Sequence, residues 1–175
     1  MKKIIIILSV VSSLNFITKT KSKELVIPKE AIRLRVVANS NKENDQKIKM
    51  KLSIEMENEI QTLLKDTTNI KEANQIINNN MEMLNLKIKR VLLEENYPND
   101  YKLTFGNTFF PEKKYKGVLY EQGYYNTLLI TLGKGEGNNW WCVLFPPLCL
   151  MEAEENNTGE TEYKFFVKEL LDKYL

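Results

Sequence analysis

The side chains that could carry chemistry are limited by the absence of histidine and by a cysteine count of two. Without histidine, Ser-His-Asp and Cys-His catalysis are excluded, and Cys142 and Cys149 alone cannot complete a tetrahedral zinc site. The remaining acid and base groups are carboxylates, such as Glu55, Glu57 and Glu59 on a predicted helix. They lie mostly off the apolar stripe of that helix, which is typical of a solvated face. We therefore expect no catalytic residue, no metal site and no enzymatic activity.

A glycine repeat, Gly133-x-Gly135-x-Gly137, follows a predicted strand, where the phosphate loop of a dinucleotide site would stand. Its spacing differs from GxGxxG, it leads into Asn-Asn-Trp-Trp instead of a helix, and it lacks the Lys-Ser/Thr pair of a Walker loop. We therefore expect no cofactor. A turn that folds the following tryptophans back onto a sheet is the better interpretation.

The residues after this repeat are suited to binding another protein. Trp140, Trp141, Phe145, Pro146 and Pro147 combine large aromatic area with a stiff backbone, and such side chains carry much of the binding energy at interfaces. The alternative is that they belong to the hydrophobic core. On a strand, successive side chains point to opposite faces, so one tryptophan is expected in the core and the other at the surface.

Cys142 and Cys149 are a candidate disulfide if the chain is exported. The alternative is two buried free thiols packed as small hydrophobic side chains. The prolines between them could turn the chain back or hold it extended, so the spacing leaves both alternatives open.

The N-terminus predicts export. Lys2-Lys3 precedes the apolar run Ile4–Val11, which is the order of a secretory signal, and this run is shorter than the ~20 residues that span a bilayer. Residues 1–23 are therefore expected to be a signal peptide or N-terminal anchor and the only contact with a membrane.

The body that follows is mildly acidic. Five of the 25 basic residues precede the first acid, Glu24, which leaves 20 basic against 23 acidic residues. Such a balance gives no electrostatic footprint for nucleic acid, so we expect no nucleic-acid partner.

Apolar residues at spacings of three and four predict two long helices. The first begins at a Ser40-x-x-Glu43 capping box and runs to about Lys65, and the second begins at Asn69-x-x-Glu72 and ends near Asn96. Because the break between them is short, the two helices are expected to be antiparallel neighbours.

Alternating patterns predict strands, with Arg33 and Arg35 on one solvated face of the first and a hairpin turn at Gln122-Gly123. The expected strands are 32–37, 101–110, 115–121, 124–132 and 141–145. The fold class is therefore α+β, with the two antiparallel helices and a C-terminal helix packed on a largely antiparallel sheet.

The domain organisation follows from these elements. Residues 24–151 are expected to form a single α+β domain, followed by an acidic linker at 152–160 and a C-terminal amphipathic helix at 161–175.

Three separated motifs resemble one known family. Gly133–Cys149 is similar to a GxGxNWWCVLFPPLC hallmark, Ile32–Ser40 with the charged stretch after it resembles an opening strand and helix, and Tyr124–Gly133 resembles a later strand. The order and spacing of these blocks, from about residue 31 to 150, resemble those of the stage II sporulation protein R family.

The resemblance implies a signalling role during sporulation. Members of that family are secreted from the forespore into the space between forespore and mother cell. There they activate a membrane-embedded aspartic protease of the mother cell, their receptor, which cleaves the sigma factor E precursor. The residues alone leave two alternatives: an exported cell-wall hydrolase, which would need a nucleophile such as Cys142 or Cys149, and a structural protein of the septal space.

Overall fold

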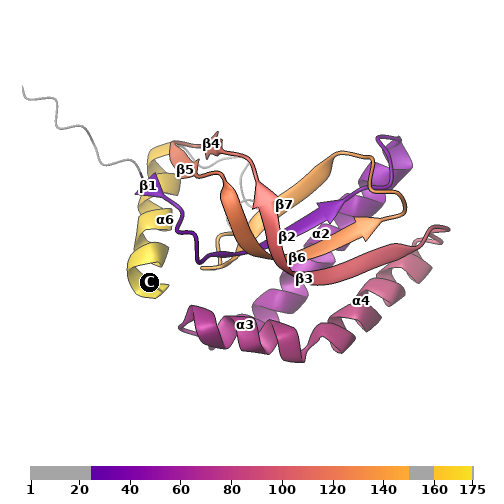
Figure 1. The fold of residues 1–175 in the computed structure, drawn as a ribbon, viewed down its shortest axis with the longest axis horizontal. Helices are drawn as coiled ribbons and strands as arrows, with labels where there is room; N and C mark the ends of the chain where they lie inside the picture. The colour runs from indigo at the N-terminus through magenta and orange to yellow at the C-terminus, as the bar shows by residue number, and fades with distance from the viewer. Residues whose placement is uncertain (1–24, 150–159, 175) are drawn as a thin grey trace, which may run out of the picture.

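The computed structural model describes residues 25–149 and 160–174 (Figure 1). The predicted signal or anchor at 1–23 and nearly all of the acidic linker lie outside the described residues. In chain order the elements are β1 (Leu25–Val26), β2 (Ile32–Val37), α2 (Glu43–Leu64), α3 (Ile70–Asn79), α4 (Met81–Glu94), β3 (Tyr101–Phe110), β4 (Lys113–Tyr115), β5 (Val118–Tyr120), β6 (Gly123–Leu132), β7 (Asn139–Phe145) and α6 (Glu160–Tyr174).

The larger sheet in the described part of the chain has four strands in the order β3-β6-β2-β7. The central strand β2 runs parallel to β6, with Arg33 opposite Thr127, and antiparallel to β7, with Arg35 opposite Trp141. Strand β3 runs antiparallel to β6. Helices α2, α3 and α4 lie along one face of this sheet (Figure 1). The predicted α+β class is confirmed.

The main core lies between these helices and the sheet. Most of the apolar stripe predicted for the first helix is buried there, and so is every second residue of β2, from Ile32 to Val36. Lys87 on α4 joins the two long helices through ion pairs with Glu55 at 2.8 Å and Glu59 at 3.5 Å on α2. The core side chains include Ile48, Leu52, Met56 and Ile60 of α2, Leu84 and Ile88 of α4, and Leu34, Val36, Leu128, Ile130 and Leu144 of the sheet.

The helix boundaries differ from the prediction at two points. The second helix is interrupted at Asn80, whose side-chain amide donates to the Ile76 carbonyl at 2.8 Å, and α3 and α4 are therefore separate. Asparagine favours such breaks because its side chain competes for backbone groups. The Asn69 cap is confirmed, since its Oδ1 accepts from the Glu72 N–H at 2.9 Å. The Ser40 capping box is wrong: α2 begins after Lys42, which makes no side-chain cap.

The predicted hairpin at Gln122-Gly123 is also wrong. Strand β6 pairs with β3 instead, so that Phe110 lies opposite Gly123 and the chain between them leaves the large sheet. That excursion turns at Lys116-Gly117, where both residues have positive φ, and pairs β4 with β5. Strand β1 pairs with β5 to give a second, smaller sheet in the order β1-β5-β4.

Helix α6 packs on the smaller sheet, at the end of the molecule where β1 and β5 lie (Figure 1). It begins at Glu160, one residue before the predicted start. Its buried Val167 belongs to a second hydrophobic cluster with side chains of both sheets: Ile27, Ala31, Val118, Tyr120, Val143 and Leu148.

Arg33 is the largest departure from the sequence-based expectation. It shares a face with Arg35, as predicted, but that face is not solvated at Arg33, whose side chain is fully buried. Its guanidinium carbon lies 3.5 Å from the ring centre of Tyr125, 4.6 Å from Phe110 and 5.0 Å from Trp141; Tyr120 is 5.8 Å away. A guanidinium is weakly hydrated and stacks on aromatic faces, which makes its burial tolerable.

The guanidinium nitrogens of Arg33 make no hydrogen bond in the described structure. Burial lowers the pKa of Arg33 to about 10, so that the group keeps its charge at neutral pH. The four surrounding rings come from both sheets, and Arg33 therefore sits where the small sheet meets the large one.

We expect Arg33→Ala to destabilise the protein by about 3–5 kcal/mol, because it removes the stacking and leaves a cavity among four rings. Arg35→Ala, at a half-buried position, is the control and should cost less than half as much. Urea unfolding of both variants measures the difference, and equal losses would contradict the central place given to Arg33.

Candidate functional site

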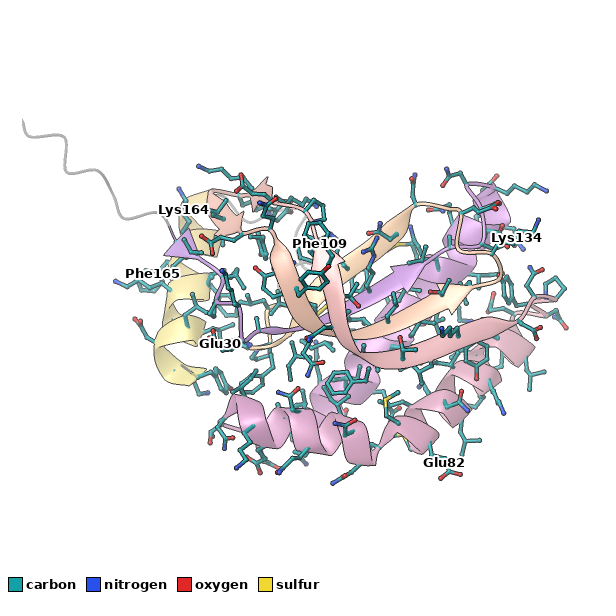
Figure 2. The ribbon with its side chains drawn as sticks, in the orientation of Figure 1. Glu30, Glu82, Phe109, Lys134, Lys164 and Phe165 are labelled. Carbon is teal, nitrogen blue, oxygen red and sulfur yellow. A yellow bond between two sulfur atoms is a disulfide. The ribbon has the colours of Figure 1, made fainter. Side chains whose placement is uncertain are left out.

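The glycine repeat wraps around the end of β2. A side-chain carbon at Gly133 would lie 2.3 Å from Asn39 Oδ1, and one at Gly137 would lie 2.4 Å from the Ser40 carbonyl oxygen. Asn39 Oδ1 accepts from the Lys134 N–H at 3.0 Å (Lys134 is labelled in Figure 2), and Asn41 Oδ1 accepts from the Asn138 N–H at 2.7 Å. The space that the glycines leave is therefore filled by the chain's own β2–α2 junction.

That junction is held by the carboxylate of Asp45. Asp45 Oδ2 accepts from Ser40 Oγ at 2.5 Å and from Asn39 Nδ2 at 2.9 Å. These hydrogen bonds, the one from Ser40 first, lower the pKa of Asp45. The ionised carboxylate thus fixes Asn39, and Asn39 fixes the glycine loop that leads into β7.

The two tryptophans point to opposite faces of β7. Trp140 packs against the main core beneath the helices, whereas Trp141 packs against the second cluster. Trp141 stacks edge-on against Tyr120 at 5.3 Å and Phe110 at 5.6 Å between ring centres. Both tryptophans are half-buried, so each contacts a core and also reaches the surface.

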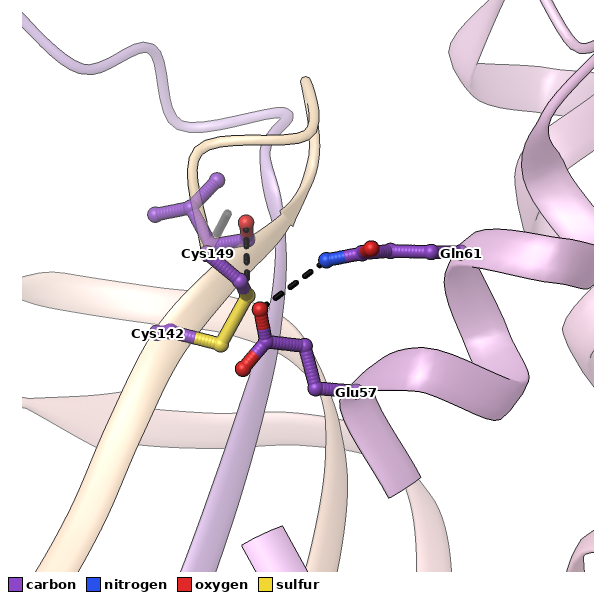
Figure 3. The surroundings of a disulfide bond; sticks show 5 residues. Glu57, Gln61, Cys142 and Cys149 are labelled. Atoms are coloured by element: carbon purple, nitrogen blue, oxygen red, sulfur yellow. Dashed lines mark hydrogen bonds between the residues drawn. A yellow bond between two sulfur atoms is a disulfide. The ribbon is translucent and has the colours of Figure 1, made fainter. Parts of the chain in front are cut away.

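The end of the segment is a closed turn. Cys142 and Cys149 form a disulfide, with their sulfur atoms 1.99 Å apart, and the Leu148 N–H donates to the Val143 carbonyl at 3.1 Å. Cys149 Sγ also lies 3.0 Å from that carbonyl oxygen (Figure 3), although a disulfide sulfur has no proton to donate. The described residues contain no free cysteine.

The other three predicted binding residues lie in or beside this turn. Phe145 and Pro146 are buried, and Phe145 stacks on Tyr174 of α6 at 5.3 Å. Pro147 is half-buried on the wall of a groove of about 510 Å³. The groove lies beside the C-terminal part of α2 and is lined by Asn58, Gln61, Thr62, Leu64, Lys65, Thr67, Leu144, Phe145, Pro147 and Tyr174.

Glu57 does not lie on a solvated face of its helix, contrary to the sequence-based expectation. Its residue is only 5% exposed, and its carboxylate lies beside the disulfide, where it accepts from Gln61 Nε2 at 2.9 Å (Figure 3). Burial raises the pKa of Glu57, and the Gln61 hydrogen bond opposes that rise. Glu55 and Glu59 are instead engaged by Lys87.

The described residues hold no cluster of three or more metal-ligating side chains, and none of their helices is long and apolar enough to cross a membrane. The candidate site is the surface built from β7 and its disulfide-closed turn. Its aromatic and cationic neighbours, Arg33, Phe110, Tyr120 and Tyr125, were missed from the sequence. They lie near the ends of four different strands, and no local pattern indicates that they converge.

Comparison with known proteins agrees with the motifs. A family model described as stage II sporulation protein R matches residues 28–155. The stage II sporulation protein R of Bacillus subtilis (strain 168) is 37% identical over 158 residues, covering 90% of this chain and 70% of that protein. The chain belongs to the stage II sporulation protein R family.

Family membership supports a role in sporulation. The residues matched by the family model include Arg33 and the whole segment from Gly133 to Cys149. Helix α6 lies beyond the range of that model. No solved structure matches the chain.

The packing of the glycine loop predicts that Gly137→Ala destabilises the protein by about 1–3 kcal/mol, because the new carbon meets the Ser40 backbone, which cannot move aside easily. Gly106→Ala is the matched control, since no heavy atom lies within 4 Å of its added carbon. Thermal unfolding of the two variants checks this expectation, and a neutral Gly137→Ala would show that the loop is not held closely against β2.

The surroundings of Glu57 predict how the stability of the folded protein changes with pH. A carboxyl group with a raised pKa favours folding when protonated, so its contribution falls as pH rises through its ordinary value of 4.5. Glu57→Gln should therefore raise Tm by a few degrees at pH 7 and by little below pH ~4. Glu59→Gln, which loses an ion pair with Lys87, should give no gain. If Glu57→Gln changed Tm equally at both pH values, the raised pKa of Glu57 would be contradicted.

Proposed function

We propose that this chain is an exported signalling protein that activates a membrane-embedded aspartic protease of the mother cell, which then cleaves the sigma factor E precursor. The proposal places the chain in the space between forespore and mother cell, secreted from the forespore. Membership in the stage II sporulation protein R family is the observation that carries it.

The form of the Trp140–Pro147 segment supports a binding role. The glycine loop fixes its start, the disulfide closes its end, and the tryptophans are anchored in two separate cores. A surface held in this way loses little conformational entropy when a partner binds. Trp140, Trp141 and Pro147 all reach the surface and are the proposed points of contact.

The alternative of a thiol-dependent hydrolase lacks support. Both cysteines of the chain are joined in the disulfide, and the chain has no histidine to activate a nucleophile. Lys2-Lys3 and the apolar run after it, together with the disulfide, fit an exported protein, since disulfides persist in oxidising compartments.

Activation by a ligand needs only a difference in affinity. If this chain binds the active form of the protease more tightly than the inactive form, the population of the active form rises without any chemistry by the ligand. A tenfold difference in affinity corresponds to about 1.4 kcal/mol, which one well-packed aromatic contact can supply.

Co-expression in a non-sporulating bacterium tests the function. We expect the protease to cleave the sigma factor precursor when the full chain is present, and not when residues 1–23 are deleted so that the chain stays in the cytoplasm. Precursor cleavage is measured on immunoblots. Cleavage that is independent of this chain would contradict the proposal.

Tryptophan variants in the same assay separate binding from folding. A contact role for Trp140 predicts that Trp140→Ala reduces cleavage more than the loss of folded protein explains, and Phe145→Ala is the control for a purely buried aromatic residue.

A further inference from the structure

We propose that the outer edge of β7 accepts an extended segment of the partner as an added strand, and that this segment places an acidic side chain beside Arg35 and Lys113. The inference rests on the proposed function and specifies the surface and the partner chemistry that it requires.

Strand β7 ends the large sheet, with β2 on one side only. The Val143 carbonyl points away from β2, because it accepts from the Leu148 N–H of the following turn. In an antiparallel pair the N–H and C=O of one residue point to the same side, and the side alternates along the strand. The N–H and C=O groups of Trp141 and Asn139 therefore also point outward.

These outward groups are not paired within the described residues. The Leu148 turn covers the edge at Val143, but no hydrogen bond reaches the main-chain N–H or C=O of Trp141 or Asn139 there. An open strand edge of this kind is a template for another extended chain. Since the open stretch is short, side chains must supply much of the specificity.

The side chains next to this edge are cationic and aromatic. Trp141 lies on the strand itself, with Lys113 Nζ 5.2 Å above its ring and the guanidinium of Arg33 5.0 Å from it. Arg35 is the register partner of Trp141, and its Nη1 donates to the carbonyl of Phe109 on β3 at 3.4 Å, while its Nε has no hydrogen-bond partner.

Among the described residues, no carboxylate forms an ion pair with these cations. Every ion pair among the described residues is made by a lysine other than Lys113, and no arginine takes part in one. Arg35 is half-buried and Lys113 is exposed, and positive charge without a counter-ion favours a partner that supplies an Asp or Glu side chain. An extended acidic segment satisfies the strand edge and the cations together.

Hydrogen exchange on the full-length protein, with and without the aspartic protease in detergent micelles, tests the strand addition. We expect the amides of Asn139 and Trp141 to exchange more slowly in the complex. Binding with protection elsewhere and none at these amides would overturn this inference while leaving the proposed function intact. Absence of any binding would overturn both.

Two matched pairs of variants test the chemistry in the same binding assay. Asn139→Pro removes one outward N–H, which an edge strand tolerates, and should weaken binding about fivefold, whereas Asn139→Ala keeps the N–H and should bind normally. Lys113→Glu should weaken binding by roughly 3- to 10-fold, and Lys71→Glu, an equal charge change on α3, should not. Equal effects within either pair would overturn the proposal.

Hydrogen exchange of the protein without its partner distinguishes two other occupants of the β7 edge. If Asn139 and Trp141 are already protected and lose that protection when Glu152, Glu154 and Glu155 are changed to Gln, the chain's own acidic segment covers the edge. If their protection rises with protein concentration, a second copy covers it. Either result would overturn the assignment to the partner.

Discussion

The burial of a charged guanidinium among aromatic rings is the interaction on which both layers of the fold depend. Arg33 projects from the central strand of the large sheet, and the rings around it come from β3, β5, β6 and β7. Because the described residues give it no hydrogen bond or counter-ion, the aromatic faces must balance the loss of hydration. The small sheet and α6 have a defined place on the large sheet because these rings converge there.

The two faces of the large sheet therefore differ in what covers them and in which side chains they carry. The helix-covered face is an ordinary apolar core, closed by α2, α3 and α4. The opposite face is covered only in part, and it carries the two arginines and Trp141. On strand β7, Trp140 packs against the core on one face and Trp141 against the cluster on the other. The segment with the most unusual composition is therefore also the one that joins the two cores.

Local patterns predicted most of the fold, and long-range packing explains what they missed. Spacings of three and four located the helices, and alternation located the strands, because both depend on neighbours in sequence. The break at Asn80 arose from a side chain that captures a backbone carbonyl, and the β4–β5 excursion arose because β6 pairs with β3. At the site, the opposite faces of the tryptophans followed from alternation. The burial of Arg33 and Glu57 did not, because it depends on residues far along the chain.

The position of β2 in the large sheet constrains the order in which the protein can fold. Its two neighbours, β6 and β7, both come from the last third of the described domain, and both of its edges stay open until they arrive. Such distant pairing slows folding and leaves an apolar strand exposed meanwhile. A chain truncated anywhere before Asn139 would keep an unpaired edge on its central strand, and would therefore be prone to aggregation instead of forming a smaller, independently folded unit.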